Sequence, residues 1–243
     1  MTKFALLICL AFTVPLGGAA LAQGSLFGKA DELLKQGGSS AGDLTASEIG
    51  DGLREALRVG TERVVGQLGQ TDGFNADPDI HIPLPASLQR VQTALQAVGM
   101  SDLADDLELR LNRAAEAATP AAKKLFWDAI SEMSLDDAKA ILDGPDDAAT
   151  RYFQDKMTAP LSDAMRPVID ESLAEVGAIA SYDRMMGEYR SLPFVPNAKA
   201  NLTDYALGEA LDGLFTYIAR EEAAIRADPA KRTTEILQRV FGG

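Results

Sequence analysis

The polar residues at positions 112–116, in the order Asn-Arg-Ala-Ala-Glu, form the group in this chain that is best spaced for a functional site. Arg113 and Glu116 are three residues apart, so on a helix they share one face and can pair. Asn112 follows Leu111, which belongs to a seam of leucines, and a buried Asn or Arg at such a position needs hydrogen-bond partners. We interpret the group first as a structural network, with a ligand-binding cleft as the alternative.

His81 is the only histidine among 243 residues, so any chemistry that needs an imidazole depends on it. It lies between Ile80 and Ile82, where polar and apolar residues alternate as they do in an extended segment. The spacing of a helical zinc motif is missing, and no second histidine or nearby cysteine completes a metal site. We therefore expect His81 to be a structural or surface residue, and we expect no metal and no cofactor.

Carboxylates are the remaining candidates for catalysis, because the G-x-S-x-G match at 38–42 has no predicted strand before it, as a nucleophile elbow requires. Glycoside hydrolysis needs only paired carboxyl groups. The candidates for such a pair are Glu108, Glu116, Asp146 and Asp147. Asp147 is also four residues before Arg151, which favours an ion pair on a solvated helix face. Catalysis would require two of these carboxyl groups to face one cleft.

The segment 70–85 is rich in turn-forming residues, with one glycine and three prolines. Its side chains include oxygen ligands of the kind that calcium prefers, namely Asp72, Asn75, Asp77 and Asp79. The spacing of an EF-hand fails, because the sixth residue counted from Asn75 is Ile80 and the twelfth is Ala86. A turn-rich loop is the simpler interpretation, and a calcium site is the alternative.

The first 22 residues are typical of an export signal that is removed. Lys3 precedes an apolar run over 4–14, and Ala20 and Ala22 supply the small residues of a cleavage site. The apolar run is too short to span a bilayer. We predict a signal peptide over 1–22, a Gly/Ser-punctuated arm over 23–43 and a helical domain over 44–243, with the mature protein soluble in the periplasm or secreted.

The cysteine content and the net charge limit the kinds of site and partner that the mature chain can have. Cys9 is the single cysteine and lies in the predicted signal peptide, so the mature chain has none, as is common in bacterial periplasmic proteins. The formal net charge is -13, which disfavours binding to nucleic acid. We expect no transmembrane segment in the mature chain.

Apolar residues from Thr45 onward recur at the three- and four-residue spacing of amphipathic helices, and no run of alternating strands is present. The pattern predicts an all-α fold with one multi-helix globular domain. Pro160 and Pro167 predict a break or kink in the helix over 146–176. The helices are expected at 26–35, 45–68, 86–98, 101–118, 120–133, 134–142, 146–176, 179–189, 203–227 and 229–240.

Several blocks of sequence resemble the bacterial family of proteins of unknown function numbered 4197, in the same order and spacing from about residue 26 to 241. The resemblance implies a single exported all-helical domain in Gram-negative bacteria and implies no activity. Some members carry a lipoprotein cysteine at the end of the signal, where this chain has Ala22-Gln23. The blocks are SEIGDGLREALRVGTERVVGQLG at 47–69, IPLP at 82–85, LNRAAEAATP at 111–120, DDAATRYF at 146–153, LPFVP at 192–196, ALDGLF at 210–215 and EEAAIRADPAKRTTEIL at 221–237.

Together these observations favour a non-catalytic periplasmic protein that binds a partner protein or an apolar small molecule. A helix rich in Met and Tyr over 179–189 and a proline-bracketed apolar connector over 192–196 could pack around a ligand. The alternative is a carboxylate-dependent hydrolase that acts on a cell-envelope substrate. The most useful structural observation is whether Asn112, Arg113 and the 72–85 segment enclose a cleft or form part of a filled core.

Overall fold

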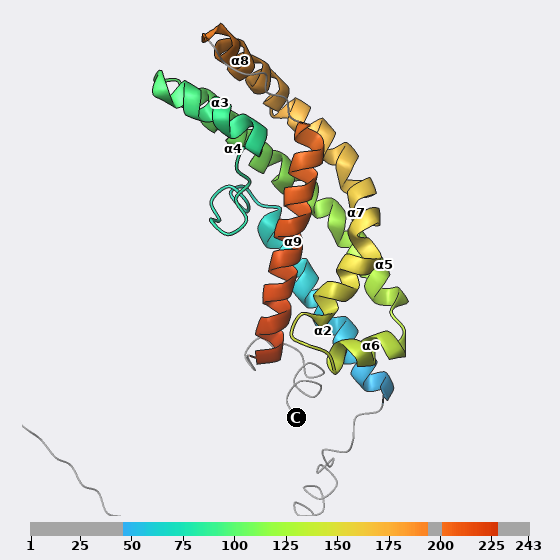
Figure 1. The fold of residues 1–243 in the computed structure, drawn as a ribbon. Coiled ribbons are helices and arrows are strands. Elements are labelled where there is room, and N and C mark those ends of the chain that lie inside the picture. The colour runs from blue at the N-terminus through green and yellow to red at the C-terminus, as the bar shows by residue number, and fades with distance from the viewer. Residues whose placement is uncertain (1–45, 194–200, 228–243) are drawn as a thin grey trace, which may run out of the picture. The chain divides into compact units, whose positions relative to one another are not determined.

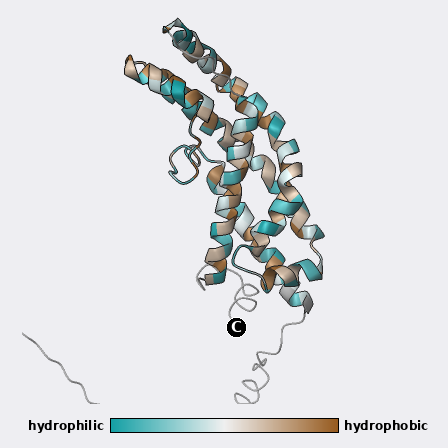
Figure 2. Cartoon of the chain, in the orientation of Figure 1, coloured by the Kyte–Doolittle hydropathy of each residue, from teal (hydrophilic) through white to brown (hydrophobic). Residues whose placement is uncertain are grey.

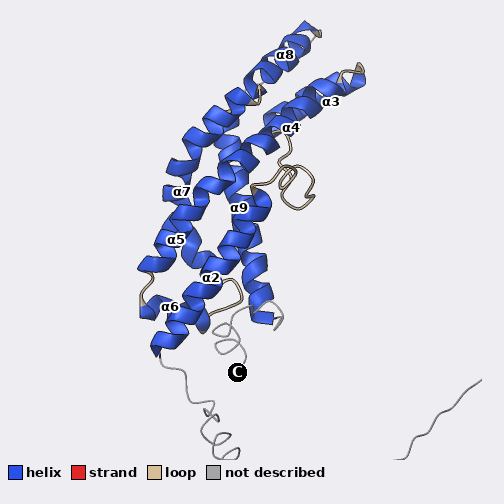
Figure 3. Cartoon of the chain, turned by 180° about the vertical axis from the view of Figure 1, so that it is seen from behind, coloured by secondary structure: helices blue, strands red, loops and turns tan. Residues whose placement is uncertain are grey.

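The computed structural model describes residues 46–193 and 201–227. In these residues the segments with amphipathic spacing form helices. No strand occurs among these residues (Figure 3), which confirms the all-α prediction. The predicted signal peptide, the arm and the helices at 26–35 and 229–240 lie outside them. The elements are α2 (Ala46–Leu68), α3 (Ala86–Ala97), α4 (Ser101–Ala118), the 3-10 turn η1 (Thr119–Ala121), α5 (Ala122–Glu132), α6 (Leu135–Leu142), α7 (Ala148–Glu175), α8 (Ala178–Ser191) and α9 (Leu202–Ala227).

Helices α4, α7 and α9 form the centre of the domain. Helix α9 packs against α2, α4 and α7, and α4 also packs against α3 and α8 (Figure 1). Helices α3 and α8 lie side by side at the end of the bundle opposite α6 (Figure 1). Each helix carries both hydrophilic and hydrophobic residues (Figure 2), and the three- and four-residue spacing of the hydrophobic ones gives a side that is buried against the neighbouring helices.

One large cluster contains nearly all buried apolar residues, including aromatic rings from α5, α7 and α9, and Ala56 and Ile225 form a separate small cluster. Phe126 of α5 contacts Phe153 of α7 edge to face, with ring centroids 5.2 Å apart, and lies 6.5 Å from Phe215 of α9. Along α4, small alanines and the leucines at 107 and 111 are fully buried, which lets neighbouring helices approach closely.

Of the break or kink expected at Pro160 and Pro167, the break does not occur, because α7 runs from Ala148 to Glu175 through both prolines. Both prolines are exposed, so water can bind the carbonyl groups that a proline leaves without a helical N–H donor. Helix α7 carries an uninterrupted row of buried residues at four-residue spacing, and neither proline belongs to that row. Burial of that row holds the helix together across the two prolines. The row consists of Phe153, Met157, Leu161, Met165 and Ile169.

The segment between α2 and α3 is the one long loop within 46–193, and its apolar side chains enter the core. Phe74, Ile80, Ile82 and Leu84 are buried, whereas Pro83 is exposed. Burial alternates over 80–84, the pattern that is typical of an extended segment, while Ile80 itself lies in a turn and its N–H donates to the carbonyl oxygen of Asp77. No helix in the described part of the chain has the length and apolar character needed to cross a membrane.

Gly213 of α9 lets this loop approach the helix. A methyl group at Gly213 would lie 2.7 Å from Cε1 of Phe74 and 3.3 Å from Cβ of Ile80, whereas one at Gly208 would meet nothing within 4 Å. We predict that Gly213→Ala destabilises the protein by about 1–3 kcal/mol through overpacking, because the buried Phe74 ring has no room to move. Gly208→Ala, the matched control on the same helix, should stabilise it by about 0.5–1 kcal/mol.

Urea unfolding of both variants measures the two effects. Equal stabilisation by the two substitutions would contradict the close contact between α9 and the loop.

Candidate functional site

The candidate site is the contact between α4 and the loop over 69–85, which we call the strapped loop. Glu108, Asn112 and Glu116 follow one another at four-residue intervals on α4 and therefore lie on one face. Each of the three side chains binds backbone groups of the strapped loop. A helix thus supplies hydrogen bonds that the loop cannot make by pairing with itself.

Asn112 is fully buried and holds the extended part of the loop. Its Oδ1 accepts a hydrogen bond from the N–H of Ile82 at 2.9 Å, and its Nδ2 donates to the carbonyl oxygen of Ile82 at 2.9 Å. Nδ2 also donates to the carbonyl oxygen of Glu108 at 2.9 Å. One amide side chain therefore satisfies both backbone groups of Ile82, as a neighbouring strand would.

Glu116 is buried and holds the beginning of the loop. Its Oε1 accepts hydrogen bonds from the N–H groups of Phe74 and Asn75, each at 3.1 Å. Its Oε2 pairs with Arg113 at 2.7 Å, and Arg113 also binds Oδ1 of Asp72 at 2.7 Å. The hydrogen bond to Glu116, aided by the one to Asp72, raises the pKa of Arg113, so the buried carboxylate keeps a charged partner.

His81 is half-buried and bridges the loop to α4. Its Nε2 lies 2.9 Å from Oε1 of Glu108, and its Nδ1 lies 2.9 Å from the carbonyl oxygen of Asn75. Oε2 of Glu108 accepts a hydrogen bond from the N–H of Leu84 at 3.1 Å. Both ring nitrogens and both carboxylate oxygens are thus engaged inside the protein.

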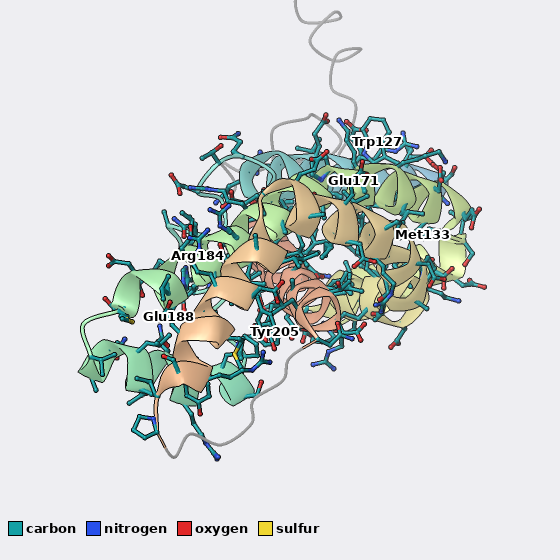
Figure 4. All side chains as sticks on the ribbon, turned by 90° about the horizontal axis from the view of Figure 1, so that it is seen from above. Trp127, Met133, Glu171, Arg184, Glu188 and Tyr205 are labelled. Carbon is teal, nitrogen blue, oxygen red and sulfur yellow. The ribbon has the colours of Figure 1, made fainter. Side chains whose placement is uncertain are left out.

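Helix α9 holds the other side of the strapped loop. The hydroxyl group of Tyr205 (Figure 4) donates to the carbonyl oxygen of Pro83 at 3.0 Å. The hydroxyl group of Tyr217 donates to Asp77, and Arg220 binds Asp79 at 2.8 Å. These three α9 residues belong to no recognisable motif, so sequence reasoning missed them.

Burial and hydrogen bonding shift the pKa values of the groups between α9 and the strapped loop. Burial, followed by the nearby carboxylates of Glu209 and Glu108, raises the pKa of Tyr205 to about 12. Burial alone would raise the pKa of Asp77, but hydrogen bonds from Tyr217 and from the N–H of Asp79 lower it on balance. The tyrosine hydroxyls therefore stay protonated donors while the loop carboxylates stay charged acceptors.

The structure brings four of the six predicted site residues together, namely Asn112, Arg113, Glu116 and His81. The other two lie elsewhere: Asp146 is exposed between α6 and α7, and Asp147 pairs with Arg151 at 2.8 Å. That ion pair confirms the interpretation of Asp147 as part of a solvated helix face. The six residues therefore do not surround one cleft.

The carboxylates at the strapped loop are bound to donors and do not face one another across a cleft. Glu108 and Glu116 each accept backbone N–H groups of the loop. The carboxylates proposed as calcium ligands point to cations or hydroxyl groups, and no group of three metal-ligating side chains occurs among the described residues. Asp72 adopts a positive φ of 69°, and its Oδ1 accepts from both Arg113 and Asn75.

A second buried polar cluster, which the sequence did not indicate, joins α9 to α7 and α6. The carboxylate of Glu222 accepts hydrogen bonds from the N–H groups of Ala149 and Thr150, each at 2.9 Å. Arg226 pairs with Glu222 at 2.9 Å and donates to the carbonyl oxygen of Ile141 at 2.7 Å. The pair thus caps the beginning of α7 and the end of α6.

Two open hollows lie on the described surface. One, of about 380 Å³, is formed by the start of the strapped loop; we call it the loop hollow. The other, of about 330 Å³, lies between α5 and α7 beside α6; we call it the α5–α7 groove. Two further spaces between α2 and α9 measure only about 20 Å³ each and are lined mainly by apolar side chains. The loop hollow is lined by Gln67, Gln70, Thr71, Asp72, Gly73, Ala76, Asp77 and Pro78.

The fold and the strapped loop define an all-helical domain whose buried polar side chains bind its own backbone. The family model described as "Protein of unknown function (DUF4197)" matches residues 43–242, so the chain belongs to this family. Neither a curated protein nor a solved structure is significantly similar to the chain.

We predict that Asn112→Leu destabilises the protein by roughly 2–4 kcal/mol, because it leaves the buried N–H and carbonyl groups of Ile82 without partners. Asn75→Ala is the control, since the Asn75 side chain binds Asp72 at an exposed position, and it should cost less than about 1 kcal/mol. Chemical denaturation measures both, and hydrogen exchange at residues 80–84 reports the loop. Similar losses in the two variants would contradict the role of Asn112.

Proposed function

We propose that this protein is exported from the cytoplasm and acts in the cell envelope as a non-catalytic helical domain that binds a partner protein. The observation that carries this proposal is the use of the polar side chains at the strapped loop. Side chains that could do chemistry, such as Glu108, Glu116 and His81, are occupied by internal hydrogen bonds. The loop is therefore held as a preformed surface, which suits recognition.

A partner protein suits the described surface better than an apolar small molecule. Sites for small molecules are mostly apolar clefts of about 300–1,000 Å³ that enclose most of the ligand. Two mainly apolar spaces between α2 and α9 are about 20 Å³ each, whereas the loop hollow and the α5–α7 groove are open and carry charged side chains. Such surfaces resemble the polar rim of a protein interface.

Hydrolysis by paired carboxylates gains no support from the described geometry. Glu108 and Glu116 hold the loop, while Asp146 and Asp147 lie at the start of α7. General acid–base catalysis needs a carboxyl group within reach of a substrate, and these groups reach backbone donors instead.

Export can be tested by determining the first residue of the protein that is recovered from outside the cytoplasm. We predict that protein recovered from the periplasm of a Gram-negative host begins at Gln23, because small residues at Ala20 and Ala22 define the cleavage site. Replacing both alanines with leucine should leave the precursor uncleaved, whereas Leu21→Phe should be processed normally. Intact-mass spectrometry distinguishes these forms, and cytoplasmic retention of the unmodified precursor would exclude export.

Partner binding is tested by photo-crosslinking in living cells. A photoreactive phenylalanine at Ala76, in the loop hollow, or at Ala129, in the α5–α7 groove, should capture one discrete protein. The same group at exposed Gln96 of α3 is the control and should capture none. The crosslinked band should saturate as the amount of this protein increases, because a specific site is limited by its partner. Failure of both hollow positions to crosslink, or equal crosslinking at all three, would contradict the proposal.

A further inference from the structure

The α5–α7 groove combines an apolar floor with an acidic rim. Its floor is formed by Leu125 and Ala129 of α5 and by Tyr152, Met157 and Pro160 of α7. Met157 is almost fully buried and Tyr152 is partly buried, so the floor is continuous with the core. The remaining lining residues are all charged, namely Asp128, Glu132, Asp137 and Lys156.

The charges of the rim are unbalanced. Three carboxylates and one ammonium group line the groove, a net charge of -2, and counting Lys124, the partner of Asp128, leaves a net charge of -1. Asp128 pairs with Lys124 at 2.5 Å, and Asp137 accepts hydrogen bonds from Ser134 as part of a helix cap. Glu132 forms no ion pair with any described residue and is exposed. A cation placed over the floor would therefore meet Glu132 first.

Tyr152 adds a polar group at the edge of the floor. Burial, followed by the carboxylates of Asp137 and Glu132, raises the pKa of its hydroxyl group. A protonated phenol beside two carboxylates presents both an aromatic face and an oxygen acceptor to an incoming cation. The groove thus offers an apolar surface for a carbon chain and acceptors for its charged end.

We propose that the α5–α7 groove binds a basic, amphipathic segment of a partner protein. The inference rests on the proposed function and identifies the surface and the chemistry of the partner. Apolar side chains of the segment lie on Leu125, Tyr152 and Pro160, and a lysine or arginine reaches Glu132 and Asp137. A second copy of this chain is a poor occupant, because each copy carries a formal net charge of -13.

The loop hollow does not offer the same combination. Its lining is mostly amide, hydroxyl and carboxylate side chains, with Ala76 and Pro78 as the apolar contribution. Its two carboxylates are already bound, Asp72 by Arg113 and Asp77 by Tyr217. Charge complementarity therefore favours the α5–α7 groove.

The test uses the purified protein and a synthetic peptide of leucine and lysine at helical spacing. The peptide should bind with saturation and shift the backbone NMR signals of residues 125–132 and 152–160. Glu132→Lys should weaken binding by roughly fivefold and Lys156→Glu should strengthen it by roughly fivefold, because each changes the charge of the rim by two. Calorimetry or fluorescence anisotropy of a labelled peptide measures these changes.

Glu188→Lys is the matched control, since it makes the same charge change on the exposed face of α8. Figure 4 shows Glu188 on the opposite side of the molecule from Met133, which directly follows Glu132. This variant should bind the peptide within about twofold of the unmodified protein, because screening limits long-range attraction. Equal weakening by Glu188→Lys and Glu132→Lys would reduce the effect to general attraction by an acidic protein and overturn the proposal.

Two further peptides complete the design. A leucine–glutamate peptide of the same pattern tests charge, and a lysine–serine peptide tests the apolar floor; neither should bind comparably. Comparable binding of either one, or no binding of the leucine–lysine peptide, would overturn the proposal. If the groove fails in this way while Ala76 still crosslinks to a partner, the proposed function stands without it. If no position crosslinks, the proposed function itself fails.

Discussion

The pair of hydrogen bonds between Asn112 and the backbone of Ile82 is the constraint on which the site depends. A loop that carries Phe74, Ile80, Ile82 and Leu84 into the core must also bring their backbone groups away from water. Asn112 makes that burial possible at its deepest point, since it satisfies an N–H and a carbonyl group at once. Without such a partner the burial of these apolar side chains would be offset by the desolvation of the backbone.

The same solution recurs at the other end of the domain. Glu222 and Arg226 of α9 bind the free N–H groups at the start of α7 and the free carbonyl at the end of α6. Both clusters use a carboxylate or amide on a rigid helix to satisfy backbone groups far away in the sequence. Helix α9 contributes to both, through Tyr205 and Tyr217 at the strapped loop and Glu222 near its end. Helix α9 therefore contacts both the strapped loop and the junction between the end of α6 and the start of α7.

Apolar periodicity was sufficient to predict the class of fold and most helix positions, because most of the stability of a helix comes from burial of its apolar face, and that face is visible in the sequence. The break that Pro160 and Pro167 allowed for does not occur, although a proline inside a helix removes a backbone hydrogen bond. Here both prolines are exposed to water, and burial of the row from Phe153 to Ile169 outweighs that loss. Local sequence does not encode which face of a helix is solvated when apolar and polar residues are mixed, as they are in α7.

Only those contacts of the polar site that join residues close together in the sequence could be predicted. Arg113 and Glu116 are neighbours on one helix, so their pairing could be read from spacing. Tyr217 and Asp77 are 140 residues apart, and only the packing of α9 against the loop brings them together.

The chemical nature of a residue also does not determine its use. His81 and Glu108 have the composition of a catalytic dyad, yet each has its polar atoms directed at the loop backbone or at the other. A catalytic group must exchange its partner for a substrate, whereas these groups would release the loop if they did so. The same hydrogen bonds that hold the loop thus support the non-catalytic role proposed above. The proposed recognition of a partner therefore rests on side chains at the surface, where Glu132 beside apolar residues has no ion pair with a described residue that must break before a partner binds.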